Sequence, residues 1–185
     1  MTRPTMTKTL FATLAATLLA MAGCASAPET REAQHDLEAD AQATLDAMME
    51  ADPTLEPLLD QAYGYVVFPE VSEGAMIAGA ASGVGVVYEN GRAIGYAELR
   101  EGSVGAQAGG QEYAELIVIR NERTMRQIRN GTFDLRADAT ATAVQSGAAA
   151  NAVFQDGTAV FVDLESGLMA EASIGGQNIR FQPEG

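Results

Sequence analysis

Residues 83–99, GVGVVYENGRAIGYAEL, decide the fold, because they combine two strand-prone runs with a turn signal between them. Valine, isoleucine and tyrosine are enriched in strands, and the two runs are built largely from them. The pair Asn90-Gly91 lies between the runs and accepts positive φ in a tight two-residue turn. The stretch therefore predicts an antiparallel β-hairpin.

Further strand candidates flank this hairpin on both sides. Residues 63–69, YGYVVFP, read as a short strand that we expect to stop at Pro69. Residues 112–119, EYAELIVI, are apolar on both faces after Glu115, which is typical of a central strand. The hairpin is thus predicted to belong to a larger sheet.

The second half of the chain continues the pattern. Asn121 is a suitable N-cap for a helix over 122–130. Residues 133–143 alternate apolar and polar side chains, and this period of two predicts a strand in spite of the many alanines. The pair Asp156-Gly157 separates AVF from AVFV and predicts a second hairpin turn.

Two helices are expected before the sheet. Asp36 is the expected N-cap of the first, which Pro53 ends, and residues 54–62 form a second, shorter helix. Apolar residues of the first helix recur at helical spacing, namely Leu37, Ala41, Leu45, Met48 and Met49. Its polar face is acidic, whereas helices that lie on membranes usually carry a basic one, so packing against the core is favoured over a membrane-surface role.

Glycine is abundant, with 19 residues, and many of them occupy strand-like positions. Glycine in a strand marks a bend, a bulge or a close backbone approach, so a strongly curved sheet is expected. The predicted fold class is α+β, with N-terminal helices followed by a curved, mostly antiparallel, barrel-like β-sheet and one further helix. Six glycines either line a groove for an acyl chain or allow tight sheet packing: Gly83, Gly85, Gly105, Gly109, Gly175 and Gly176.

The first 24 residues have the order of a secretory leader. Arg3 and Lys8 form a basic head, residues 10–21 carry no charge, and two small residues precede Cys24. The apolar run is shorter than the roughly 20 residues that a spanning helix needs. A cysteine at the cleavage point resembles the bacterial lipobox, which implies that Cys24 is acylated. The alternative is an ordinary cleaved leader with an incidental cysteine.

This interpretation divides the chain into a lipoprotein signal peptide over 1–23, a tether over 24–35 and a folded domain over 36–185. Acylated Cys24 would attach the protein to a membrane. By resemblance to bacterial lipoproteins, the absence of Asp after Cys24 predicts the periplasmic face of the outer membrane, within the bacterial cell envelope.

Composition excludes several classes of function. The formal net charge is −14, and a surface of this sign repels nucleic acid, so no nucleic-acid partner is expected. One cysteine and one histidine cannot build a disulfide or a Cys/His metal site, and no cofactor or metal is expected. His35, the only histidine, falls in the predicted tether and is a poor general base, so no enzymatic activity is expected.

Several stretches together resemble the SYLF domain family. They are GYVVFPEV (64–71), GVGVVYENGRAIGYAEL (83–99), GSVGAQAGGQEYAELIVI (102–119), FDLRADAT (133–140) and SGLMAEASIGGQ (166–177). The resemblance implies a lipid-binding or membrane-associating domain, and bacterial members are often predicted lipoproteins. Phosphoinositide and actin contacts of eukaryotic relatives use basic residues, and this chain has no lysine after its leader.

One basic cluster remains as a candidate site for lipid or a partner. Its members are Arg120, Arg123, Arg126, Arg129 and Arg136. Guanidinium groups bind phosphate or carboxylate through paired hydrogen bonds, but arginines on a helix also pair with local acids. The predicted function is a membrane-anchored lipoprotein with a lipid-binding domain. The alternative is a structural or protein-interaction component of the bacterial envelope, with a protein partner that the sequence does not identify.

Overall fold

The computed structural model describes residues 26–74, 79–103, 111–135, 140–164, 171–173 and 176–184. Its helices are α2 (Arg31–Ala51), α3 (Leu55–Asp60), α4 (Glu122–Arg129) and the 3₁₀ turn η1 (Ala149–Asn151). Its strands are β1 (Gly64–Gly74), β2 (Gly79–Glu89), β3 (Arg92–Ser103), β4 (Gln111–Ile119), β5 (Phe133–Leu135), β6 (Thr140–Ala143), β7 (Thr158–Leu164), β8 (Glu171–Ser173) and β9 (Gly176–Pro183). None of the described helices has the length and apolar character needed to cross a membrane.

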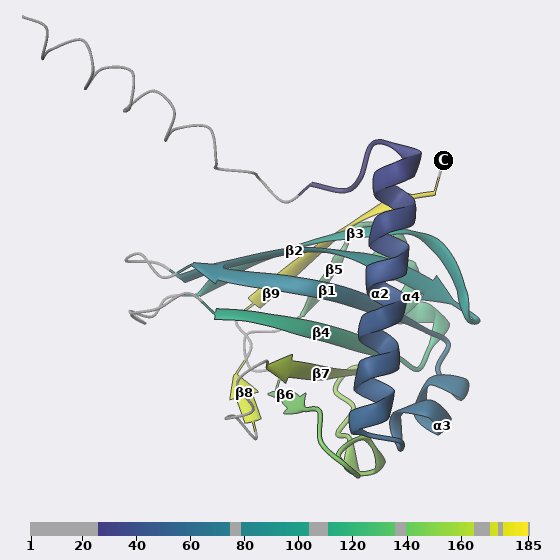
Figure 1. The fold of residues 1–185 in the computed structure, drawn as a ribbon, viewed down its shortest axis with the longest axis vertical. Helices are drawn as coiled ribbons and strands as arrows, with labels where there is room; N and C mark the ends of the chain where they lie inside the picture. The colour runs from purple at the N-terminus through teal and green to yellow at the C-terminus, as the bar shows by residue number, and fades with distance from the viewer. Residues whose placement is uncertain are drawn as a thin grey trace, which may run out of the picture.

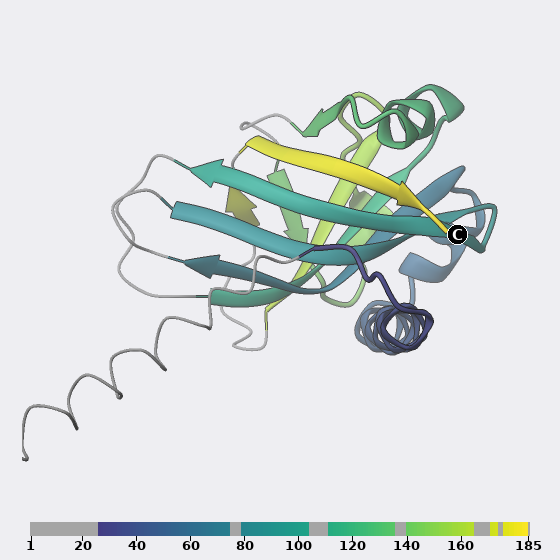
Figure 2. The same ribbon diagram turned by 90° about the horizontal axis from the view of Figure 1, so that it is seen from above.

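The nine described strands form one sheet, in the order β5-β9-β3-β2-β1-β4-β7-β6-β8. Neighbouring strands are antiparallel, apart from the parallel pair β6 and β7. The sheet curls into a half-barrel, with α2 outside the curl and α4 on the opposite side (Figures 1 and 2). The predicted α+β class and the mostly antiparallel, curved sheet are therefore confirmed.

The hairpin of β2 and β3 forms where the sequence predicted it. Asn90 and Gly91 have φ angles of 50° and 74°, the left-handed values of a tight hairpin turn. The turn at Asp156 and Gly157 is also present, with φ angles of 50° and 86°. Here the prediction of two flanking strands was wrong in part, because residues 152–154 are irregular and only β7 follows the turn.

The prediction that the first strand stops at Pro69 was wrong, because β1 runs to Gly74. The register of β1 shifts between Val67 and Glu70 opposite β2, which places Pro69 in a β-bulge. A bulge leaves a residue out of the hydrogen-bond ladder, so the missing N–H of proline costs nothing there. The prediction of one strand over 133–143 was wrong in part, because this stretch holds two strands, β5 beside β9 and β6 between β7 and β8, near opposite edges of the sheet. Residues 136–139 lie outside the described part.

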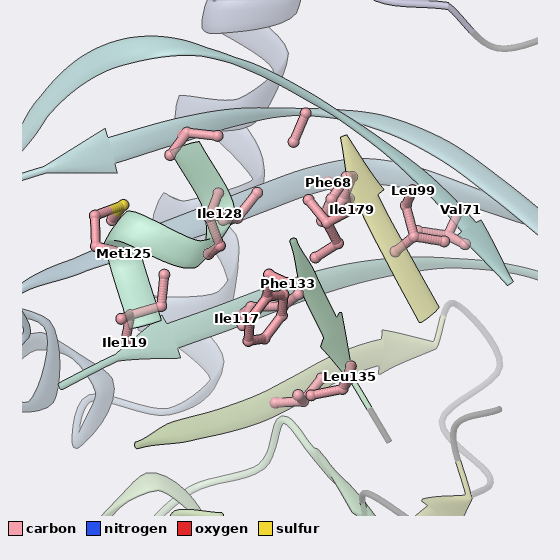
Figure 3. Close-up of a cluster of buried hydrophobic side chains, with 14 of the residues drawn as sticks. Phe68, Val71, Leu99, Ile117, Ile119, Met125, Ile128, Phe133, Leu135 and Ile179 are labelled. Carbon is pink, nitrogen blue, oxygen red and sulfur yellow. The ribbon is translucent and has the colours of Figure 1, made fainter. Parts of the chain in front are cut away.

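The inner face of the sheet, defined as the face inside the curl, is filled by apolar side chains. Met125 and Ile128 of α4 are 1% and 0% exposed and pack against the strands (Figure 3). Asn121 caps this helix as predicted, since its side chain accepts a hydrogen bond from the backbone N–H of Thr124 at 2.9 Å. Other members of this inner core are Val66, Phe68, Val71, Leu99, Ile117, Ile119, Phe133, Leu135, Val160, Val162 and Ile179.

The outer face is covered by α2 and α3, which confirms the core-packing role of the apolar stripe on the first helix. Ala41, Leu45 and Met48 are buried against alternate strand residues such as Leu116 and Val118. These two strand residues point to the opposite side from Ile117 and Ile119, so the sheet separates two cores.

The first helix begins earlier than we had predicted. Its N-cap is Thr30, whose hydroxyl accepts a hydrogen bond from Ala33 N at 3.2 Å, and Asp36 lies inside the helix. His35 is therefore on the exposed surface of α2 and not in a tether. The apolar spacing starts only at Leu37, which is why the sequence placed the start too late.

Two of the six glycines considered for a groove serve tight packing. A Cβ on Gly85 would lie 2.4 Å from the Val67 carbonyl oxygen and 2.7 Å from the ring of Phe68. A Cβ on Gly83 would lie 2.8 Å from the Glu70 carbonyl oxygen. The strands thus approach closely at the bulge. Gly105, Gly109 and Gly175 lie outside the described residues, and Gly176 is exposed.

Candidate functional site

The predicted arginine cluster lies on and around α4, and most of its described members have partners. The Arg120 guanidinium stacks over the ring of Phe154, 3.5 Å from its centroid. Arg126 forms an ion pair with Glu122 at 2.5 Å. Arg129 forms an ion pair with Glu89.

Arg123 is exposed on the same helix, and Arg136 lies outside the described residues, as Cys24 does. The pairing of Arg126 and Arg129 matches the alternative of a face neutralised by local acids. Exposed ion pairs contribute only about 0–1 kcal/mol, so Arg126, whose pair with Glu122 is exposed on both sides, can exchange this carboxylate for a partner's. The pair of Arg129 is less exposed, because the Glu89 side chain is only 11% exposed. Met125 and Ile128 fix the helix to the inner core, which keeps its arginine-bearing side turned outward.

A cleft of about 230 Å³ opens between α2 and the strands β1, β4 and β7. It lies beside the β-bulge of β1, and three carboxylates line it: Glu70, Glu112 and Asp163. Negative charge of this density disfavours a lipid phosphate or another anion. Within the described ranges, no group of three or more metal-binding side chains lies close enough to hold an ion. Because its lining is acidic, the cleft does not suit a phosphate group.

A buried polar bridge crosses the inside of the curl. The Gln177 side-chain amide of β9 donates to Glu115 Oε2 of β4 at 3.0 Å and to Glu101 Oε2 of β3 at 3.3 Å. Strands β4 and β9 are not neighbours in the sheet, because β3, β2 and β1 lie between them. The bridge therefore joins distant parts of the half-barrel through its interior.

The electrostatic state of this bridge follows from its burial. Glu115 is 0% exposed, and burial raises the pKa of its carboxyl to about 8, while the amide of Gln177 lowers the pKa and the nearby charge of Glu101 raises it. Glu115 is thus mostly protonated at neutral pH and can donate a hydrogen bond. Among the described residues, Glu115 Oε1 and Gln177 Oε1 have no hydrogen-bond partner.

The chain segment before α2 is docked on the domain, which the sequence did not predict. The backbone N–H of Ala27 donates to Glu98 Oε1 at 2.9 Å, and Ala27 is 4% exposed among outer-face residues. Pro28 is also buried, and its carbonyl oxygen accepts from Gln34 Nε2 at 3.3 Å. We call residues 27–30 with Glu98 the amino-terminal contact.

Sequence reasoning missed two features, the buried bridge at Glu115 and the amino-terminal contact. They differ in whether the sequence contains a sign of them. Glu115 stands alone in an apolar run, and an acid at a position that a central strand buries is a recognisable sign of a perturbed group. The amino-terminal contact left no such sign, because ASAPETREAQH is polar and without period. Only the position of Glu98 on the folded sheet makes a partner for Ala27.

Comparison with protein families finds a match over the second half of the chain. Residues 100–184 match the family model Ysc84, described as Las17-binding protein actin regulator. The matched range includes α4, strands β4 to β9 and both ends of the bond between Glu115 and Gln177. The description names a regulatory interaction and no chemical reaction. No curated protein matches the chain.

Proposed function

We propose that this chain is a membrane-anchored lipoprotein with a lipid-associating domain. Residues 100–184 match the Ysc84 family model, in agreement with the resemblance to the SYLF domain that the sequence motifs carry. The anchor is a diacylglyceryl group on Cys24, and the site of action is the bacterial envelope, on the periplasmic face of the outer membrane. The domain carries out no reaction of its own in this proposal.

The observation that carries the proposal is the joint occurrence of the family match and a cysteine at the end of a secretory-type leader. A domain of a lipid-associating family needs to stay at a membrane, and its acidic surface does not provide this. Each buried methylene contributes about 0.8 kcal/mol, so two or more acyl chains give stable attachment. The anchor thereby compensates for electrostatic repulsion from anionic lipid.

The mode of lipid contact follows from the core. The inner face is packed with side chains from the strands and α4, as Figure 3 shows, and the cleft on the outer face is acidic. Within the described residues, neither region offers an apolar channel to an acyl chain. We therefore propose association through the anchor and the domain surface, not enclosure of a lipid.

The test is acylation and membrane attachment of the full-length chain in a bacterial host, compared with Cys24→Ser. We expect mass spectrometry to find an acylated N-terminal cysteine, and the protein to float with membranes in a density gradient. Cys24→Ser should remain folded by circular dichroism and stay at the bottom of the gradient. A wild-type protein without acyl chains, or equal flotation of the two proteins, would contradict the proposal.

The second candidate is a protein-interaction component of the envelope, and the arginines of α4 favour it. Arg123 and Arg126 are exposed in a strongly acidic molecule, so they would attract an acidic partner. Crosslinking in cells discriminates the two candidates: a specific crosslinked partner that is lost in Arg123→Glu supports this one. Recovery of the monomer alone supports the lipid proposal.

A further inference from the structure

We propose that the domain is held upright on the membrane, with the amino end of α2 beside the bilayer and the end formed by α3 and η1 pointing away from it. This orientation rests on the proposed function, because it needs acyl chains on Cys24. It goes beyond that function in naming which surface faces lipid and which is presented to the envelope space.

The first support is the amino-terminal contact. Its hydrogen bond to Glu98, the burial of Ala27 and Pro28, and the cap at Thr30 join it directly to α2. Arg100 lies 3.7 Å from Glu98 and helps to hold that carboxylate in place. The chain is therefore fixed to the domain from Ala27 onward.

The second support is the shortness of the segment between Cys24 and Ala27. Three residue steps separate Cys24 from Ala27, and an extended chain spans at most roughly 11 Å over them. A tether over 24–35, as the sequence predicted, would have reached roughly 40 Å. A domain of about 160 residues has a radius of gyration of about 15 Å, so a link of roughly 11 Å prevents free rotation above the bilayer.

The third support is the length and position of α2. The helix has 21 residues, and at 1.5 Å per residue it extends about 31 Å. Its amino end carries the amino-terminal contact, and its other end is joined to η1, because Asp52 accepts hydrogen bonds from Gly147 N at 2.9 Å and Ala149 N at 2.7 Å. Figure 1 shows α2 running along the full height of the domain between these two ends.

The charge of α2 excludes the orientation in which the helix lies flat on the bilayer. Its exposed acids are Glu32, Asp36, Asp40, Asp46 and Glu50, and Arg31 is its only arginine or lysine. A flat helix would bring all five carboxylates to an anionic lipid surface, whereas an upright one keeps most of them beyond the Debye length of about 8 Å. Repulsion thus turns the domain upright about its short link.

The experiment compares two matched labels on the full-length acylated protein. Ala33→Cys near the amino end of α2 and Ala150→Cys in η1 are both exposed, and neither changes charge. Each variant is purified from bacterial membranes, labelled with a nitroxide and placed in vesicles of phosphatidylethanolamine, phosphatidylglycerol and a nickel-chelating lipid. We expect relaxation by lipid-bound nickel to be several-fold stronger at position 33 than at position 150.

Two further variants test the cause. Twelve Gly-Ser residues inserted between Ser26 and Ala27 should abolish the contrast between the labels while acylation persists. Glu98→Ala, which removes the acceptor of the Ala27 N–H, should reduce the contrast, and Glu98→Gln, which keeps an acceptor, should preserve it. Equal relaxation of both labels in the acylated parent, or an undiminished contrast after the insertion, overturns the orientation alone. Absence of acyl chains on Cys24 overturns the proposed function as well.

Discussion

The inner and outer faces of the sheet bury the same strands against different neighbours. The inner face is closed by the curl of the sheet and by α4, with eight residues in its helix, whereas α2, with 21 residues, lies along the outer face. On β4, Ile117 and Glu115 point inward, and Leu116 and Val118 point outward. The inner core therefore depends on contacts between distant strands, and the outer core on the helices α2 and α3 that pack against the sheet.

The polar groups on the two faces also differ in how deeply they are buried. Inside the curl, Glu115 and Gln177 are 0% and 1% exposed, and the protonated carboxyl avoids an uncompensated buried charge. On the outer face, Tyr96 is buried but its hydroxyl reaches Glu38, which is half-buried on α2. One member of the outer pair is therefore accessible to solvent, whereas both members of the inner pair are buried. Substitutions on the two faces should consequently differ in size and in pH dependence.

The largest loss in the free energy of unfolding is expected when a side chain of the inner core is truncated. Phe68→Ala removes a fully buried ring of the inner core, and we expect a loss of about 3–5 kcal/mol in the free energy of unfolding. The surrounding strands are held by the curl, and Gly85 has no side chain to fill the space. Urea denaturation followed by circular dichroism measures the loss.

Leu45→Ala is the matched truncation on the outer face. Leu45 is 4% exposed on the buried side of α2, and this helix can move toward the sheet and reduce the cavity. We expect a cost near the lower end of the range of about 2–5 kcal/mol for such changes. A larger loss from Leu45→Ala than from Phe68→Ala would show that the outer core governs stability and would reverse the comparison.

The contribution of Glu115, on the inner face, to the free energy of unfolding should depend on pH. The pKa of Glu115 is about 8 in the folded protein and 4.5 as an ordinary value, so between these pH values the folded state binds more protons than the unfolded state. The contribution of this group to stability is complete below pH 4.5 and is lost as pH rises through 8. The loss is at most about 1.4 kcal/mol per pH unit.

Glu115→Gln should remove this slope. Its free energy of unfolding, minus that of the parent protein, should rise steadily in urea denaturation series from pH 5 to pH 8. The introduced amide keeps the size of the side chain, so the change isolates the proton. A constant difference across this range would mean that the Glu115 carboxyl is ionised inside the curl, against its burial.

The sequence predicted the outer half of this comparison better than the inner half. The spacing of Leu37, Ala41 and Leu45 predicted a helix that packs on a core, and the Asn90-Gly91 pair predicted the hairpin. Period and turn chemistry are local, so one sequence can reveal them. The bridge from Glu115 to Gln177 joins residues 62 positions apart, and no local rule brings those two side chains together.

The candidate site shows the same limit. The arginine cluster was predicted from the sequence, but Glu89 and Phe154, the partners of Arg129 and Arg120, come from β2 and from the segment before β7. The start of α2 was missed because residues 31–36 are polar apart from Ala33, and a period of apolar residues is the main helix signal. The amino-terminal contact was missed for the same reason.

The smallest expected effect belongs to the outer polar pair. Tyr96→Phe removes a hydroxyl that donates to Glu38 Oε1 at 2.8 Å, and we expect a loss of about 1 kcal/mol in the free energy of unfolding. Burial, together with the bond to Glu38, raises the pKa of Tyr96, so the hydroxyl remains a donor at all ordinary pH values. The loss should therefore be constant between pH 6 and pH 8, unlike that of Glu115→Gln. Glu38→Gln, which retains an acceptor, should lose less than Tyr96→Phe. A loss in Tyr96→Phe as large as that in Leu45→Ala would mean that this bond, and not apolar packing, holds α2 to the sheet.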